Sequence, residues 1–386
     1  MPLACLTLLV PELLWPEPED REAWDGLACP ALATLLARGR SGHAPRQAFE
    51  TVLAALCGHG ETGALAACRR LGENDRAAAD GAVWLCCDPV HLRFHQDSLI
   101  PADASRIELG GDDADALAAA LDAELSAWGR FSSAAPGRGY LRLAAGRKPD
   151  DFGAPPLSAV AGRRVEHLLA DASGDWRALF NEIQMFLHDH PVNCRREAAG
   201  QLPVNAFWLW GAGALPARPE ATAGFDGVWS GDPLARGLAR AGGAAAHALP
   251  DGAAEVLGAP GQGSGASRLA VLDALLAPAQ YEHGADWRAA LLELEARWFA
   301  PARAALAAGR LARLEIVAPT AYATLRWSIG RGDLVKIWRR PRAPAQIAGA
   351  LVQATHAGQG EHAPAAQAAR PPGRNDPIEH PHPPQR

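Results

Sequence analysis

The sequence lacks the features that would place it in a membrane or on a nucleic acid. No apolar stretch approaches the roughly 18 residues of a membrane helix, and the apolar run at residues 3–10 has no basic segment before it, as a signal peptide would. The net charge is -6, whereas nucleic acids are bound by basic surfaces. We therefore expect a cytoplasmic protein with no membrane or nucleic-acid partner.

Familiar catalytic and metal motifs are also missing. The seven cysteines are irregularly spaced and form no CxxC pair, which argues against a zinc ribbon or a redox motif. There is no GxSxG turn, Walker loop or HExxH helix. The one dense basic run, at residues 336–342, is predicted to be the solvated end of a late strand rather than a phosphate site.

Alternating strand and helix signals are abundant. The chain has 386 residues, which fits two domains or one domain with an insertion. Strands are predicted at residues 3–10, 206–210, 269–272 and 314–318, and helices at 29–38, 49–57, 62–71, 175–188, 286–308 and after Asp232. This alternation predicts an α/β fold with a mostly parallel sheet flanked by helices.

The middle and the end of the chain show different residue patterns. Residues 73–174 are predicted to form a small inserted α+β subdomain, with strands at 82–88, 106–109 and 140–143 and a helix at 113–128. The core would then comprise residues 1–72 and 175–345. Residues 355–386 are rich in proline and poor in large apolar residues, so we predict a disordered tail.

The most informative polar pattern runs from His190 to Gly213 and reads HPVNCRR, then GQLPVN, then WGAG. Asparagine amides flanking turns commonly bind backbone, and an arginine can bind carboxylate or phosphate oxygens with two hydrogen bonds. A Gly-x-Gly loop after a strand lets an anion approach the backbone. An anion site and a purely structural turn network explain these residues equally well.

Two further clusters carry potential chemistry. Asp88 and His91 follow a predicted buried strand, where α/β proteins place ligands, although Asp88 also suits a turn cap. The contiguous triplet His188-Asp189-His190 invites a metal interpretation. Adjacent helical residues point about 100° apart, so an ordinary helix C-terminus is the favoured interpretation of the triplet.

The pattern from His190 to Gly213 resembles that of the archaeal-type, cofactor-independent phosphoglycerate mutases of the alkaline phosphatase superfamily, and residues 29–42 and 49–58 resemble two further segments of that family. The resemblance implies an alkaline phosphatase-like core. It also implies lost chemistry, because Phe49 stands at the nucleophile's position and Trp210 replaces an arginine. The family's metal ligands would fall at residues 10–12, 279–283 and 318–321, where only His283 matches.

We therefore expect a non-catalytic or regulatory protein without catalytic residues, metal or cofactor. The motifs DPVHL, WLWGAG and WRRPR resemble a bacterial RpfE-type regulatory, phosphoglycerate-mutase-related group. A crevice for a small phosphorylated or anionic ligand would be formed by Asp88, His91, Asn193, Arg196, Asn205, Gly211 and Gly213.

Two alternatives stay open. The first is a phosphatase or phosphomutase that uses Mn or Zn in a rebuilt site made of Asp88, His91, His188, Asp189 and His190. The second is an interaction scaffold whose protein partner is unknown.

Overall fold

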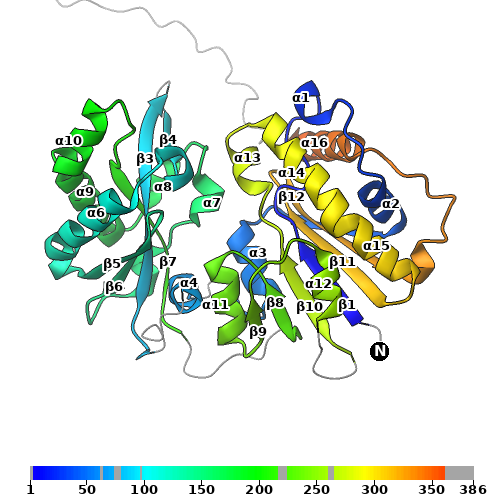
Figure 1. Ribbon diagram of the computed structural model, residues 1–386. Coiled ribbons are helices and arrows are strands. Elements are labelled where there is room, and N and C mark those ends of the chain that lie inside the picture. The colour runs from blue at the N-terminus through cyan, green and yellow to red at the C-terminus, as the bar shows by residue number, and fades with distance from the viewer. Residues whose placement is uncertain are drawn as a thin grey trace, which may run out of the picture.

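Two β-sheets organise the computed structural model, which describes residues 3–60, 64–73, 80–95, 98–215, 224–259 and 265–360 (Figure 1). The larger sheet has seven strands in the order β2-β12-β11-β1-β10-β8-β9. Its parallel strands are β1 (Leu3–Leu9), β8 (Gly227–Trp229), β9 (Ala245–His247), β10 (Ser267–Val271) and β11 (Leu311–Pro319). Antiparallel β12 (Ala323–Gly330) and β2 (Arg40–Pro45) complete one edge. The predicted α/β class is confirmed.

Helices cover both faces of this sheet. Leu6 and Leu8 of β1 share a core with α2 (Pro30–Arg38), α14 (Gly284–Leu294) and α15 (Ala300–Ala307). On the other face, Leu269 and Val271 of β10 pack with α3 (Phe49–Leu56) and α11 (Pro233–Ala241). The predicted long helix at 286–308 is α14 and α15, joined by a π-helical turn at Glu295–Phe299. Within that turn, Glu295 accepts hydrogen bonds from the first amides of α2 and so caps that helix.

The second sheet is antiparallel and corrects several predictions. It consists of β3 (Trp84–His95), β4 (Ser98–Ala102), β5 (Gly129–Ala135), β6 (Arg138–Leu143) and β7 (Ala206–Gly213). The predicted strand at 106–109 is wrong, because α5 (Ala104–Ile107) occupies that segment. β7 pairs with β3 instead of joining the parallel sheet, so the predicted boundary at 174/175 does not separate the two sheets. Helices α6 (Gly111–Glu124) and α9 (Gly174–His188) pack on this sheet.

A close helix pair connects the two sheets. α4 (Leu65–Gly72) lies against β7 and also against α11, which packs on the parallel sheet (Figure 1). The approach is possible because glycines face each other: a Cβ added to Gly237 would lie 1.6 Å from the carbonyl oxygen of Cys68. A Cβ on Gly72 would likewise lie 1.6 Å from the carbonyl oxygen of Pro233.

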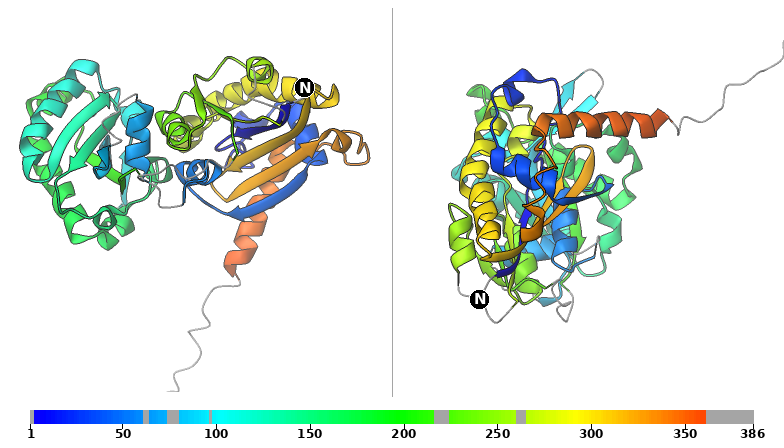
Figure 2. Two further views of the ribbon diagram at one scale, coloured as in Figure 1. Left: turned by 90° about the horizontal axis from the view of Figure 1, so that it is seen from below. Right: turned by 90° about the vertical axis from the view of Figure 1, so that its right-hand side faces the viewer.

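The remaining helices are short connectors, apart from the last. They are α1 (Arg21–Trp24), α7 (Leu157–Val160), α8 (Glu166–Asp171), α10 (Pro191–Ala198), α12 (Ala253–Gly258), α13 (Leu276–Gln280) and α16 (Pro344–Gly360). α16 projects from the body of the molecule (Figure 2) and runs past Thr355, where the disordered tail was predicted to begin. Residues 361–386 of that predicted tail lie outside the described residues. Across the described helices, none is both long and apolar enough to span a bilayer.

Candidate functional site

The parallel strands end on a common edge of the larger sheet, where α/β proteins usually bind ligands. Four carboxylates lie near this edge: Glu12 after β1, Glu50 in the first turn of α3, Asp232 after β8 and Asp273 after β10. Sequence reasoning treated Asp232 only as a helix cap and passed over Glu50 and Asp273. Each of them stands alone in the sequence without a motif, so nothing but the fold brings them to one edge.

Glu12 and Glu50 are both buried and both engaged by protein groups. Glu12 accepts a hydrogen bond from the backbone amide of Ala321 at 3.1 Å and lies 3.7 Å from Arg163. Burial raises the pKa of Glu12 to about 7 although Arg163 opposes the shift. Glu50 accepts a hydrogen bond from Ser158 Oγ at 2.5 Å, and burial raises its pKa to about 7 as well. Both carboxyl groups are therefore partly protonated near neutral pH.

Burial raises the pKa values of Asp232 and Asp273 as well. Asp232 caps α11, as predicted, by accepting hydrogen bonds from the amides of Leu234 (2.6 Å) and Ala235 (3.1 Å). Burial raises its pKa. Burial, with the nearby charge of Asp232, raises the pKa of Asp273 to about 6.

The short segment around α7 covers this edge of the sheet. Ser158 bonds Glu50 through its hydroxyl, and its carbonyl oxygen accepts a hydrogen bond from Gln280 Nε2 at 2.7 Å. Arg163 just beyond reaches Glu12. Gly162 is so close to Gln280 that an added Cβ would lie 2.5 Å from the carbonyl oxygen of Gln280. Ser158 and Arg163, from the segment around α7, thus lie against the carboxylates of Glu50 and Glu12.

These residues do not fit the pair of metal ions that two-metal phosphoryl transfer uses. Within the residues that the structure describes, no group of three or more His, Cys, Asp or Glu side chains is arranged to hold a metal ion. The buried Phe49 ring begins α3, beside Glu50, and offers no nucleophilic atom. The carboxylates instead bond to amides, a hydroxyl and a guanidinium of the protein itself.

Asp88 belongs to a buried ion pair rather than to a strand end. β3 continues through Pro89 to His95, so the prediction that the strand ends at Asp88 is wrong. Asp88 accepts two hydrogen bonds from Arg69, at 2.7 and 2.8 Å, and one from Trp210 Nε1 at 2.8 Å. The guanidinium of Arg69 lies over the rings of Tyr140 and Trp210. Arg69 escaped sequence reasoning because it looks like an ordinary charged residue of an amphipathic helix.

The asparagines and Arg196 form a network of turns. Asn193 donates to the carbonyl oxygens of Leu187 and Val204 and accepts from the Val204 amide. Asn205 exchanges two hydrogen bonds with the backbone of Leu92. Arg196 is buried, donates to the carbonyl oxygens of Leu202 and Ile107, and pairs with Asp113.

The other predicted residues spread along the β3–β7 pair. Gly211 and Gly213 lie within β7 and not in a loop beyond it, and their missing side chains make room for Leu65 and Ala64 of the α4 region. His91 Nδ1 lies 2.9 Å from the carbonyl oxygen of Pro203. The seven residues of the predicted crevice are thus not gathered around one cavity.

The side chains of residues 188–190 do not point toward a common site either. The side chains of His188 and Asp189 are almost fully exposed and lie 3.9 Å apart. His190 turns away to cap α10, accepting a hydrogen bond from the amide of Val192 at 3.3 Å. Burial lowers the pKa of His190.

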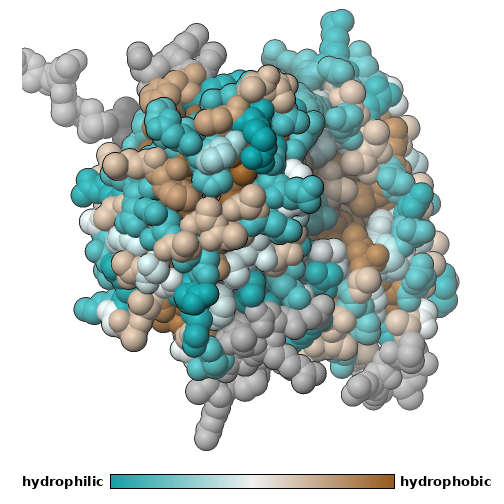
Figure 3. Space-filling model, turned by 60° about the vertical axis from the view of Figure 1, so that its left-hand side comes forward, coloured by the Kyte–Doolittle hydropathy of each residue, from teal (hydrophilic) through white to brown (hydrophobic). Residues whose placement is uncertain are grey.

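His91 does line a cleft of about 430 Å³ between the two sheets. Arg93 and Arg106 enter it from the antiparallel side, while Tyr281 and Glu282 close it from the end of α13. The hydroxyl of Tyr281 accepts a hydrogen bond from the Asp103 amide at 3.0 Å, which ties the two walls together. The surface is hollowed between the two halves of the molecule, with hydrophobic residues at depth (Figure 3).

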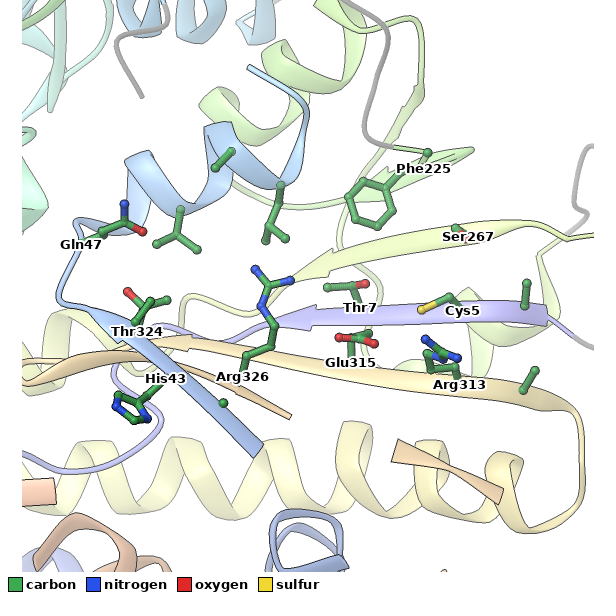
Figure 4. Close-up of a pocket in the computed structure, with 18 residues that line it drawn as sticks. Cys5, Thr7, His43, Gln47, Phe225, Ser267, Arg313, Glu315, Thr324 and Arg326 are labelled. Atoms are coloured by element: carbon green, nitrogen blue, oxygen red, sulfur yellow. The ribbon is translucent and has the colours of Figure 1, made fainter. Parts of the chain in front are cut away.

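A larger hollow, of about 930 Å³, lies on the α3 face of the parallel sheet. Its floor crosses four strands and is polar: Thr7, Glu315, Arg326 and Ser267 point into it (Figure 4). Sheet faces in α/β proteins are normally covered by apolar helix packing. Among the described residues, no apolar helix packing fills this part of the sheet face.

Comparisons with known proteins agree with the resemblance seen in the sequence. No family model matches the chain. A 2,3-bisphosphoglycerate-independent phosphoglycerate mutase of Methanothermobacter thermautotrophicus is 30% identical over 152 residues, which cover 38% of this chain and 37% of that protein. One from Methanothrix thermoacetophila is 34% identical over 73 residues, 19% of this chain and 17% of the relative. The alignments thus span little more than a third of these relatives at most.

The solved structure of a Pyrococcus horikoshii protein can be superposed on 95% of this chain and on 100% of its own length. The two chains are 14% identical in sequence, and the TM-score is 0.49. Over about a third of its length, the chain is thus distantly similar to 2,3-bisphosphoglycerate-independent phosphoglycerate mutases.

Proposed function

We propose that this protein is a non-catalytic, regulatory relative of the phosphoglycerate mutases that binds a small anionic ligand. The observation that carries the proposal is the closed edge of the parallel sheet. Phe49 occupies the place that the resemblance assigns to the nucleophile, and Ser158 bonds the neighbouring Glu50 at 2.5 Å. A carboxyl group that is bonded by the protein and has a pKa of about 7 is a poor ligand for a divalent ion.

The proposed ligand site is the cleft between the sheets. His91, Arg93 and Arg106 bring two permanent positive charges and one imidazole to a space of about 430 Å³. Guanidinium groups bind phosphate and carboxylate oxygens with paired hydrogen bonds. Glu282 is the one acidic residue of the lining, so the cleft favours an anion. A regulatory role is what the resemblance to the RpfE-type group implies.

Activity and metal content test the absence of catalysis. Purified protein is incubated with Mn²⁺ or Zn²⁺ and either 3-phosphoglycerate or p-nitrophenyl phosphate, and its bound metal is measured by mass spectrometry. We expect turnover no faster than the metal-only blank and no stoichiometric metal. Turnover that disappears in His91→Ala would establish the rebuilt phosphatase site instead.

Calorimetric titration tests the cleft separately. We expect saturable binding of 3-phosphoglycerate or inorganic phosphate that weakens about tenfold in Arg93→Ala and in Arg106→Ala. Arg303→Ala is the matched control, because Arg303 is an exposed arginine on α15 far from the lining. Equal affinities in all three variants, or no binding to the wild type, would show that this cleft is not an anion site.

A further inference from the structure

The edge strand β2 has no neighbour on its outer side among the described strands. All six of its residues are exposed. An uncovered strand edge presents free backbone N–H and C=O groups, and natural proteins usually block such edges with charge, proline or a covering element. Apart from Arg40 at its start and Pro45 at its end, β2 consists of small or neutral residues. Its middle is therefore open to pairing.

A hollow of about 720 Å³ lies beside β2, between this strand and the segment that leads from β12 to α16. Ser41, Gly42 and His43 of β2 form one wall. The opposite wall carries Arg339, Arg340 and Arg342. Among the described residues, no aspartate or glutamate lines the hollow, although the whole chain has a net charge of -6. Its positive charge is therefore local and unbalanced.

The same segment exposes large apolar side chains. Val335, Ile337 and Trp338 are 68%, 75% and 73% exposed, and Trp338 lines the hollow. Residues 336–342 were predicted to end a late strand, and that prediction is wrong because they form turns between β12 and α16. Arg339 fixes the segment to the start of β2 by donating hydrogen bonds to the carbonyl oxygens of Arg38 and Gly39. Exposed tryptophan beside arginine is the composition of a binding hot spot.

We propose that β2 and this basic hollow form a docking site for an extended, acidic segment of a partner protein. The segment adds as an outer strand to β2 through backbone hydrogen bonds, as in β-augmentation. Side chains of an added strand point alternately to the two sheet faces. On one face they meet Arg339, Arg340, Arg342 and Trp338. On the other they approach the open polar hollow that contains Arg326 and also reaches Gly42 and His43 (Figure 4).

Charge decides against the other occupants of this edge. A second copy pairing through β2 would bring two sets of these arginines together, and like charges across an interface oppose association. The chain's own residues 361–386 contain three acidic residues and three arginines, so their side chains offer no net negative charge. They are also rich in proline, which lacks the N–H that strand pairing requires. An extended acidic segment of a partner would pair with the free backbone groups of β2 and also neutralise the arginines.

Fluorescence polarisation with synthetic peptides tests the site. The probe is a fluorescein-labelled peptide of about eight residues that alternates glutamate and valine, a length that matches an edge strand. We expect saturable binding that weakens about tenfold in the double variant Arg340→Glu/Arg342→Glu and in Trp338→Ala. Arg303→Glu, a charge reversal on α15, should bind as the wild type does. Circular dichroism confirms that each variant is folded.

Two control peptides separate strand addition from simple charge attraction. A glutamate–valine peptide whose backbone nitrogens are all methylated has the same charge but cannot donate strand hydrogen bonds, and one that alternates lysine and valine reverses the charge. We expect neither to bind saturably. Equal binding of the methylated peptide, or unchanged binding by the double variant, would overturn the proposal.

Two further results would assign the surface differently. A concentration-dependent dimer in light scattering, lost in the double variant while the probe does not bind, would make it a self-association face. Sedimentation with vesicles of about 30% phosphatidylserine but no peptide binding would make it a membrane surface.

Discussion

The indole nitrogen of Trp210 donates a hydrogen bond to Asp88 Oδ2 at 2.8 Å, while Arg69 binds both oxygens of the same carboxylate. Trp210, which by the resemblance takes the place of an arginine, is therefore more than an apolar replacement. Its N–H serves a buried ion pair that joins α4, β3 and β7. Asp88, which seemed in the sequence to belong to a ligand site, instead holds α4 against the antiparallel sheet.

The ion pair gives the first prediction. Asp88→Ala leaves the Arg69 charge buried without its partner, so we expect the free energy of unfolding to fall by about 3–5 kcal/mol. Urea denaturation measures the loss. Glu293→Ala removes a half-exposed partner of Arg297 and should cost at most about 0.5 kcal/mol. A similar small cost for both variants would contradict the assigned role.

The glycine contact between α4 and α11 gives the second prediction. Gly237→Ala places a methyl group within 1.6 Å of the Cys68 carbonyl oxygen, so the helices must separate, at a cost of about 2–4 kcal/mol. Gly111→Ala is the matched change on α6, where an added Cβ meets nothing within 4 Å. There the better helix propensity of alanine should leave stability equal or slightly higher. Thermal unfolding of both variants checks the difference, and equal melting temperatures would contradict it.

The parts of the fold that local chemistry determines could be predicted from the sequence. Pro30 and Gly39 delimit α2, and Asp232 with Pro233 begins α11, as expected. The buried parallel strands appear as short apolar runs, such as β1 and β10. A helix cap or a short apolar strand is determined by a few consecutive residues, so its prediction does not require knowledge of distant contacts.

Features that depend on long-range pairing could not be predicted. A proline usually marks the end of a strand, but β3 continues through Pro89 because β7 pairs with it there. β7 itself looks like any buried strand, and nothing in its residues indicates which sheet it joins. The four carboxylates of the parallel edge come from separate loops and helices. Only the folded chain reveals that burial raises the pKa of each of them.

Asn193 gives the third prediction, which separates a structural residue from a ligand contact. Its amide nitrogen donates to two carbonyl oxygens, at 2.8 and 2.7 Å. Asn193→Asp keeps the shape but replaces this donor with a carboxylate oxygen, so we expect a loss of about 2–4 kcal/mol. Asn181→Asp, on the exposed side of α9, should change stability by no more than about 0.5 kcal/mol. If Asn193→Asp left stability unchanged but abolished anion binding, Asn193 would be a ligand-binding residue after all.

Glu50 gives the fourth prediction, a dependence of stability on pH. Burial raises its folded pKa to about 7, above the ordinary value of 4.5. Below pH 4.5 the carboxyl group is protonated in both states and contributes nothing. Between pH 4.5 and about pH 7, Glu50 loses its proton in the unfolded chain but keeps it in the folded chain. Stability therefore falls as the pH rises through this window, and the cost is complete above about pH 7.

Glu50→Gln removes the charge and keeps an acceptor for Ser158, so it removes this cost. We expect the variant to match the wild type near pH 4.5 and to exceed it by about 1–3 kcal/mol at pH 8. Urea denaturation at several pH values measures the difference. The exposed Glu255→Gln controls for the loss of one surface charge and should follow the wild type throughout. A Glu50→Gln variant that is less stable than the wild type at pH 8 would mean that the charged carboxylate stabilises this edge, as a cation-binding site would require.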